Sequence, residues 1–174
     1  MLLILRDILL YLTLAVMLRL FVFSLSCIKG SSMLPTLQDG DWVLVWRLSY
    51  LLHTPKRQDV IICHYPGRRM KQCKWIPMCF IKRVIGIPGD LIEIDHGTVL
   101  IDGHPLAEPY LDPDKCNYER SRPLRRLGRQ DFYVLGDHRD RSNDSRSVGP
   151  IRRNAVYGRA VCIIWPPKRW QKIR

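Results

Sequence analysis

The sequence has few acidic residues for its length, and it lacks repeats and low-complexity tracts. Its 174 residues include 28 Lys and Arg but only 16 Asp and Glu, so the net charge at pH 7 is +12. This imbalance indicates an anionic partner, either nucleic acid or the anionic face of a membrane. The absence of internal repeats argues against a solenoid, and the absence of biased tracts argues against a disordered polar chain.

The six cysteines do not have the spacing of a metal site. No C-x-x-C motif and no Cys/His spacing of a zinc site occurs. Cys63 and His64 are adjacent, so their side chains would diverge on a strand. We therefore expect no metal and no cofactor. Cys73 and Cys79 flank a loop that a disulfide can close if the domain lies outside the cytoplasm, and free thiols are the alternative.

The longest apolar run covers residues 8–28 and is interrupted only by Thr13, Arg19, Ser24 and Ser26. As a helix it would span about 31 Å, close to the hydrocarbon thickness of a bilayer. Arg19 costs roughly 2.5–3.5 kcal/mol near the middle, which the many apolar residues can offset. A cleavable signal peptide is the alternative, although the run is long for one and no small-x-small site follows it. We predict a membrane anchor over residues 1–28.

Residues 29–174 have the pattern of a domain made of short strands and turns. All 11 glycines and 12 prolines lie in this part of the chain. Strand-forming residues predominate at 41–46, 59–63, 79–87, 91–94, 98–101, 132–135 and 155–164. We expect loops at 105–113 and 120–129 and a solvated basic tail from residue 166. The predicted fold is mostly β, an antiparallel, barrel-like domain on one N-terminal transmembrane helix.

A serine lies in a turn-forming context between the apolar run and the first strand. Residues 30–37 read GSSMLPTL, and the proline favours a turn or extended chain over a helix. The Ser32 hydroxyl can point into a cleft there, with its own N–H available to an oxyanion. A flexible linker is the alternative. Because four extended residues from Ile28 reach at most about 14 Å, the anchor would hold Ser32 at the membrane surface.

Two later segments carry further chemistry. Lys82 lies between Phe80 and Val84 on one face of a predicted strand. Desolvation by such neighbours lowers the pKa of a lysine, and the neutral amine can act as a base. A lysine that extends its amine to solvent from an edge strand is the alternative. Residues 136–146, GDHRDRSNDSR, interleave both signs of charge, which is typical of an ion-pair network but can also supply a hydroxyl that orients an amine.

Taken together, these segments resemble the signature boxes of bacterial type I signal peptidases. The matching segments are residues 30–37, residues 82–90 (KRVIGIPGD) and residues 136–146, in the family's order. Residues 55–60 and 102–110 are similar to the segments between the boxes. The resemblance covers residues 26–165, and the single short anchor resembles the small Gram-positive and cyanobacterial forms.

The resemblance implies a serine endopeptidase with a Ser-Lys dyad. Ser32 would be the nucleophile, Lys82 the general base and Ser142 the hydroxyl that orients the lysine amine. The Ser32 N–H would form the oxyanion hole, to which some relatives add a hydroxyl at the position of Gly30. No hydroxyl is available at Gly30, so that contribution must come from elsewhere or be absent.

The resemblance also assigns structural and substrate-binding roles. Asp144 and Arg146 would support the Ser142 loop. The small-residue subsites would be lined by Ile28, Met33, Leu37, Phe80 and Ile81. Two residues depart from the family pattern: His138 stands where Asn is usual, and Gln58 where Gly is usual. We do not expect His138 to be the base, because the motif supplies a lysine and no matching Asp-His-Ser order is evident.

The implied substrates are exported preproteins with small residues at −1 and −3 of the cleavage site, as in A-x-A. The implied partners are the lipid bilayer and the protein translocation machinery, not nucleic acid. The expected location is the plasma membrane, crossed once, with residues 29–174 forming a β-rich serine peptidase domain on the extracytoplasmic side.

Three other functions are compatible with parts of the sequence. A self-cleaving repressor of the SOS-response kind would be cytosolic, which the apolar run argues against. A dedicated processing peptidase for one substrate, such as a pilin, fits the same motifs. A non-enzymatic, membrane-anchored basic β-domain fits the net charge, but the alternating charges of residues 136–146 and the lack of an aromatic RNA-binding motif argue against it.

Overall fold

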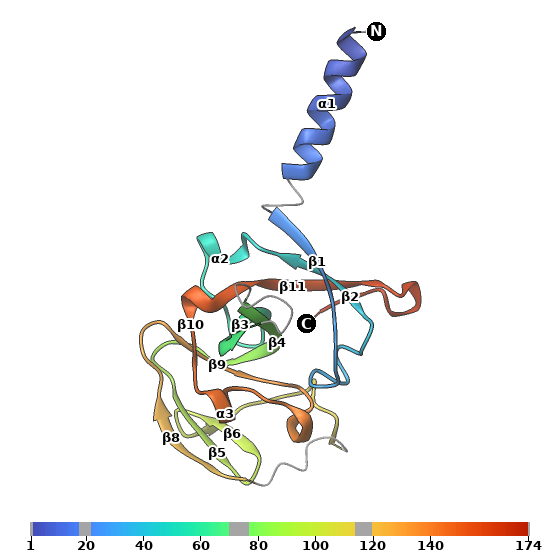
Figure 1. The fold of residues 1–174 in the computed structure, drawn as a ribbon. Helices are drawn as coiled ribbons and strands as arrows, with labels where there is room; N and C mark the ends of the chain where they lie inside the picture. The colour runs from blue at the N-terminus through green and yellow to red at the C-terminus, as the bar shows by residue number, and fades with distance from the viewer. Residues whose placement is uncertain (1, 18–21, 70–76, 114–119, 174) are drawn as a thin grey trace.

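The structure is a computed structural model that describes residues 2–17, 22–69, 77–113 and 120–173. Figure 1 shows one helix, α1 (Leu2–Met17), standing clear of a body made of two sheets. Every strand pairing among the described residues is antiparallel. The prediction of an antiparallel, mostly β domain is therefore confirmed.

The larger sheet has the strand order β1-β2-β11-β3-β4-β9-β10, with β12 paired to β11. Its strands are β1 Phe23–Cys27, β2 Trp42–Trp46, β3 Val60–Arg69, β4 Pro77–Gly86, β9 Asp131–Leu135, β10 Ile151–Arg152, β11 Val156–Trp165 and β12 Gln171–Lys172. Among the described strands, this path is open at β1 and at β10, so the barrel-like closure that we predicted is not seen.

The smaller sheet has the order β7-β6-β5-β8. Its strands are β5 Leu91–Asp95, β6 Thr98–Ile101, β7 His104–Pro105 and β8 Arg122–Arg126. Short helical turns connect the strands: α2 Ser49–Leu52, η3 Arg139–Arg141, α3 Ser145–Val148, η4 Arg153–Ala155 and η5 Pro167–Arg169. The turns η3 and α3 follow β9 and carry the segment that resembles the third signature box.

The predicted single helix over residues 8–28 is wrong. Helix α1 is described only as far as Met17, residues 18–21 lie outside the described part of the chain, and Phe23–Cys27 form a strand that pairs with β2 from Phe23↔Trp46 to Cys27↔Trp42. An apolar run does not by itself distinguish a helix from a strand. Residues 23–27 form a strand because they pair with β2, a segment that lies beyond the Ser32 turn. No helix within the described ranges is both long and apolar enough to cross a membrane.

Two predicted irregular segments are ordered as strands. Residues 122–126, placed in a loop by sequence, form β8 at the edge of the smaller sheet. The tail forms η5 and β12 instead of a solvated end, and Ile173 is buried against the core. Both strands are short and basic, so they lack the apolar pattern that predicts a strand. They are strands because they pair with β5 and β11. Cys73, one half of the suggested disulfide, lies outside the described residues.

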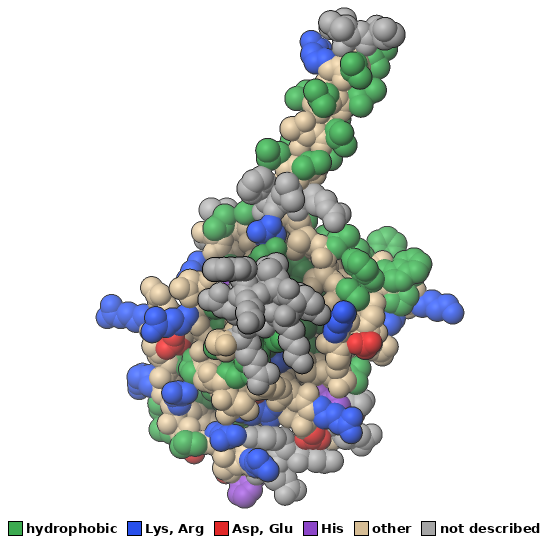
Figure 2. Space-filling model, in the orientation of Figure 1, with side chains coloured by type: hydrophobic (Ala, Val, Ile, Leu, Met, Phe, Trp, Pro, Cys, Tyr) green, Lys and Arg blue, Asp and Glu red, His purple; other side chains and the backbone are tan. Residues whose placement is uncertain are grey.

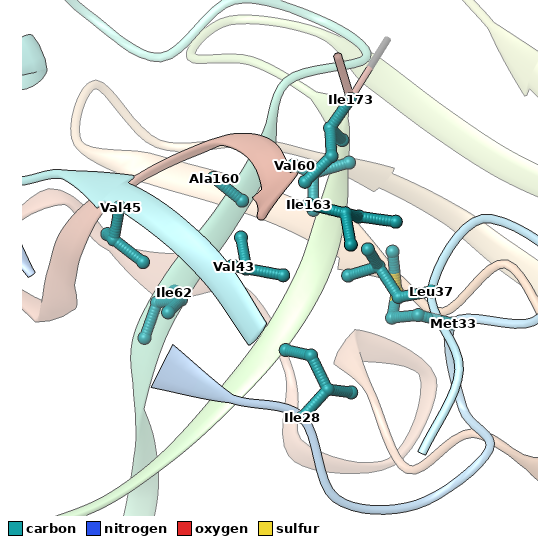
Figure 3. Close-up of a cluster of buried hydrophobic side chains, with 10 residues drawn as sticks. All are labelled: Ile28, Met33, Leu37, Val43, Val45, Val60, Ile62, Ala160, Ile163 and Ile173. Carbon is teal, nitrogen blue, oxygen red and sulfur yellow. The ribbon is translucent and has the colours of Figure 1, made fainter. Parts of the chain in front are cut away.

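The core next to the serine segment lies between the loop after β1 and the larger sheet. Figure 3 shows Ile28, Met33 and Leu37 from that loop packed with side chains of β2 and β11, including Val43 and Ile163. These five side chains are at most 4% exposed. Burying one such side chain stabilises the fold by about 1.5–3 kcal/mol, so the loop that carries Ser32 is fixed by the core.

One face of the larger sheet is apolar but not covered by the body of the protein. Directly paired residues share a face, so Trp42 lies beside Cys27 and Trp165, and Trp46 lies beside Phe23. Trp42, Trp46 and Trp165 are 42%, 40% and 57% exposed. Figure 2 shows apolar side chains gathered on α1 and on one flank of the body. We call the exposed side chains of Phe23, Leu25, Trp42, Trp46 and Trp165 the apolar face.

Candidate active site

The Ser32 segment is a compact turn inserted between β1 and β2. The ladder of these strands continues to Ile28, whose N–H donates to the Asp41 carbonyl. Gly30 then adopts a φ of +93°, a conformation that disfavours any side chain, and its N–H donates to Asp39. The turn closes as the Leu37 N–H donates to the Met33 carbonyl. Ser32 itself is half-buried, so its hydroxyl is held by the turn but not sealed in the core.

Lys82 approaches Ser32 from the middle of β4. Its Nζ lies 2.7 Å from Ser32 Oγ and 2.8 Å from the Ile81 carbonyl oxygen. The side chain is 3% exposed. Burial lowers the pKa of Lys82 to about 8, an effect that the negative charges of Asp144 and Asp137 partly oppose. The predicted desolvated lysine is thus found, in hydrogen-bonding contact with the predicted serine.

A buried ion pair joins the serine turn, the lysine strand and the loop after β9. Arg83, next to Lys82, binds Asp137 through two hydrogen bonds of 2.9 and 2.7 Å, and both side chains are 1% exposed. Thr36 of the serine turn donates to the same carboxylate at 2.5 Å. A single carboxylate therefore sets the relative position of the three segments that carry the site.

The loop after β9 also contacts the serine turn through the backbone and the side chain of His138. The His138 N–H donates to the Ser32 carbonyl, and His138 Nδ1 lies 3.1 Å from the Ser31 carbonyl oxygen. A Cβ on Gly136 would lie 2.5 Å from the Ser32 carbonyl oxygen and 2.1 Å from Ser142 Oγ. Only glycine therefore allows the two serine-bearing segments to pack against this point of the backbone.

Asp144 and Arg146 hold the same loop from within. Arg146 binds the Asp144 carboxylate at 2.8 Å and donates to the Arg139 carbonyl at 2.7 Å. Asp144 in turn accepts a hydrogen bond from the Gly136 N–H at 3.0 Å. All four residues are buried.

The Ser142 hydroxyl is buried and, among the described residues, makes no hydrogen bond. The contact with the Lys82 amine that we expected from the sequence is therefore not made in this structure. The hydroxyl packs against Gly136, where an added Cβ would lie 2.1 Å from Ser142 Oγ.

Comparison with known proteins agrees with the motifs. Residues 1–165 match the family model described as signal peptidase, peptidase S26. The chain belongs to the signal peptidase family. It is 38% identical over 163 residues to a probable signal peptidase I-1 of Synechocystis sp., a match that covers 93% of this chain and 81% of that protein. It is 34% identical to a signal peptidase I of Bacillus caldolyticus, over 88% of this chain and 85% of the relative.

A solved structure supports the fold. A signal peptidase I from Enterococcus faecalis V583 is 29% identical and superimposes with a TM-score of 0.51, covering 61% of this chain and 96% of that one. The predicted family and the prediction of a peptidase are thus confirmed. The readings as a repressor or as a non-enzymatic basic domain are not supported.

The signal peptidase site includes residues whose roles the sequence did not reveal. Glu108 forms an ion pair with Arg139 and accepts a 2.5 Å hydrogen bond from Tyr110. The Arg83 guanidinium lies 3.9 Å from the centre of the Tyr110 ring. The segment 108–110 thereby braces the loop after β9 against β4. Its resemblance to a family segment was visible in the sequence, but these partners were not.

The five residues expected to line the subsites of this signal peptidase are placed at different depths. Ile28, Met33 and Leu37 are buried in the core, while Ile81 packs on that cluster and is half-buried. Phe80 is half-buried beside Tyr65, with ring centres 5.1 Å apart. Of these five residues, only Phe80 and Ile81 are not fully buried.

Proposed function

We propose that this signal peptidase cleaves exported preproteins by acyl transfer, with Ser32 as nucleophile and Lys82 as general base. The observation that carries the proposal is the 2.7 Å contact between Lys82 Nζ and Ser32 Oγ, made by a lysine whose pKa burial lowers to about 8. A lysine in that state is neutral in part of the molecules near neutral pH and can accept the serine proton.

The proposed reaction has two halves, acylation and deacylation of Ser32. In each half Lys82 accepts one proton and then gives one back. Lys82 takes the Ser32 proton while Ser32 Oγ attacks the scissile carbonyl carbon. The tetrahedral oxyanion is stabilised by the Ser32 N–H, and its collapse breaks the peptide C–N bond as protonated Lys82 gives its proton to the leaving amine. Water then attacks the acyl-enzyme with Lys82 again as base, and the ester oxygen of Ser32 recovers its proton.

We propose that the subsites accept only small side chains at −1 and −3 of the substrate. Ile28, Met33 and Leu37, which flank Ser32 in the chain, are packed in the core and are at most 4% exposed. Ile81 and Phe80 would form the walls. Subsites that end on side chains packed in the core would be shallow, so alanine would fit where leucine would clash.

Membrane attachment is part of the proposal. Along α1, large apolar side chains such as Leu9 and Tyr11 are more than 60% exposed, and the helix stands clear of the sheets. The apolar face extends the same character onto β1, β2 and β11. Ordinary monomers rarely expose contiguous apolar surface on this scale, and tryptophans favour the membrane interface. Both surfaces would contact lipid, with the domain on the extracytoplasmic side of the plasma membrane.

This placement supports delivery of substrate from the membrane. The Ser32 turn follows directly from β1, the strand that bears Phe23 and Leu25 of the apolar face. A precursor emerging from the translocation machinery with its signal peptide in the bilayer would present its cleavage site at this level. The distance from Ile28 to Ser32 does not measure how far Ser32 lies from a helix end, because the chain forms strand β1 before it reaches Ile28.

The direct test is incubation of the detergent-solubilised full chain with a preprotein that has an Ala-x-Ala site. Cleavage after the second alanine, identified from the mass of the product, is expected for the wild type and not for Ser32→Ala. A precursor with leucine at −1 should remain uncleaved. Cleavage by Ser32→Ala at the wild-type rate would assign the reaction to another nucleophile.

A further inference from the structure

His138 makes two hydrogen bonds to consecutive carbonyl groups of the serine turn. Its backbone N–H donates to the Ser32 carbonyl oxygen, and its imidazole Nδ1 lies 3.1 Å from the Ser31 carbonyl oxygen. The side chain is 9% exposed, so water does not compete freely for these contacts. The two bonds together fix both the position and the rotation of the backbone at Ser32.

The second bond has a consequence for the Ser32 N–H. The Ser31 carbonyl and the Ser32 N–H belong to one planar trans peptide, in which they point in opposite directions. Holding the carbonyl on the imidazole therefore fixes the direction of the N–H. A donor on the carbonyl oxygen also polarises the peptide, which makes its N–H a stronger donor.

The chemistry of the acceptor determines which imidazole nitrogen carries the proton. A carbonyl oxygen has no hydrogen to donate, so the 3.1 Å contact requires a proton on Nδ1 of His138. Lys82, not His138, contacts Ser32 Oγ. This arrangement is different from that of a general base, which needs an unprotonated nitrogen directed at the hydroxyl.

We infer that His138 is a positioning residue, whose Nδ1–H aligns the Ser31–Ser32 peptide so that the Ser32 N–H meets the developing oxyanion. The inference rests on the proposed function and assigns a specific duty to a side chain that departs from the family pattern. Asparagine, usual at this position in the family, also carries a side-chain N–H donor. The inference therefore predicts that an amide can replace the imidazole and that an apolar side chain cannot.

The kinetic test compares His138→Leu, His138→Asn and the control His104→Leu, an exposed histidine on β7. Loss of an oxyanion donor slows catalysis by about 100- to 1000-fold, so a misaligned donor in His138→Leu should lower kcat by at least about tenfold with KM little changed. His138→Asn should stay within about threefold of the wild type. His104→Leu should behave as the wild type.

Two readouts separate alignment from general damage. Affinity for a peptide aldehyde, whose adduct with Ser32 carries the tetrahedral oxygen, should fall in His138→Leu as kcat falls, while affinity for the matching product peptide is retained. The acid limb of the pH profile should stay at the same pH, because Lys82 sets it. Equal loss of both affinities, a shifted acid limb, or an asparagine variant as slow as the leucine variant would each overturn the inference.

A spectroscopic measurement tests the bond without any substrate. The ¹⁵N resonances of the His138 imidazole should show Nδ1 protonated in the wild type at a pH where exposed histidines are neutral. A neutral ring protonated on Nε2 alone would overturn the inference even if every peptide is cleaved. If instead Nδ1 is protonated but no peptide is cleaved by the wild type, the proposed function fails and the positioning role in catalysis fails with it.

Discussion

Lys82 Nζ lies 2.7 Å from Ser32 Oγ, although the two residues are 50 positions apart in the chain. The contact joins a turn that leaves the first strand of the larger sheet to the middle of a strand near its other end. The Ser32 turn is fixed by the core, and Asp137 binds both Thr36 of that turn and Arg83 of β4. The backbone therefore holds Ser32 and Lys82 close together.

The first prediction concerns this pair. Ser32→Ala, Lys82→Ala and Lys82→Arg should each lower cleavage of a preprotein by about 10⁴-fold, because each removes either the proposed nucleophile or the amine proposed to accept its proton. Thermal unfolding should show that the variants remain folded. A Lys82→Arg variant with near-wild-type activity would remove the lysine from the mechanism, since a guanidinium does not deprotonate in proteins.

The second prediction is the pH dependence of the peptidase. With the pKa of Lys82 at about 8, about a tenth of the molecules carry a neutral amine at pH 7, against well under a thousandth for an exposed lysine. The kcat/KM for a short peptide should therefore rise along a single acid limb centred near pH 8 and then level off. A limb centred above pH 10 would show that the amine is not desolvated.

The same pKa predicts a stability change that needs no substrate. Between pH 8 and pH 10.5 the unfolded chain still binds a proton at Lys82 that the folded chain has lost, so the free energy of unfolding rises with pH across this window and falls again as the pH drops from 10.5 to 8. The free energy of unfolding of the wild type should gain about 3 kcal/mol relative to Lys82→Met over this range. Parallel curves for the two proteins would contradict the lowered pKa.

The third prediction concerns Ser142. Its buried hydroxyl makes no hydrogen bond among the described residues, so Ser142→Ala should leave the melting temperature unchanged or raise it. The same change should slow cleavage without abolishing it, because an orienting hydroxyl assists the base only when the amine turns toward it. An unchanged rate across the whole pH range would mean that Ser142 has no part in the reaction.

The sequence predicted the segments of the site better than the contacts between them. Strands β2, β4, β5, β6 and β9 follow from local patterns of apolar and β-branched residues, and Lys82 could be read as desolvated from Phe80 and Val84. The Arg83–Asp137 pair spans 54 positions and the Thr36–Asp137 bond 101, and no local pattern encodes them. The strand at Phe23–Cys27 was misread for the same reason, because its partner lies beyond the Ser32 turn.

The fourth prediction tests the shared carboxylate. Asp137→Asn leaves the Arg83 guanidinium buried without its counter-charge and weakens the bond from Thr36. Breaking a buried pair by removing one partner typically costs about 3–5 kcal/mol, so the variant should unfold at a clearly lower temperature and cleave peptides more slowly. Asp95→Asn, at an exposed carboxylate, is the matched control and should change neither property. Equal melting temperatures for the two variants would show that the pair does not hold the site together.

The fifth prediction concerns the membrane, and it has two parts. A chain lacking residues 2–21 should keep the whole of β1 and therefore the fold and the dyad, whereas a deletion through residue 25 would remove part of the strand that pairs with β2. Turnover of a short soluble peptide should stay within about twofold. Turnover of a precursor embedded in vesicles should fall at least about tenfold, because the enzyme loses the effective concentration that shared binding to a bilayer provides.

The apolar face should account for the activity that the shortened chain retains on vesicles. Replacing Trp42 and Trp165 by serine in that chain removes two exposed indoles that lie side by side on the sheet, and it should release the domain from vesicles and lower precursor turnover again. Trp170→Ser, which removes an exposed tryptophan outside the apolar face, is the control. If the precursor-to-peptide ratio is the same for all these chains, neither α1 nor the apolar face places Ser32 at the bilayer, and the precursor must reach the site from solution.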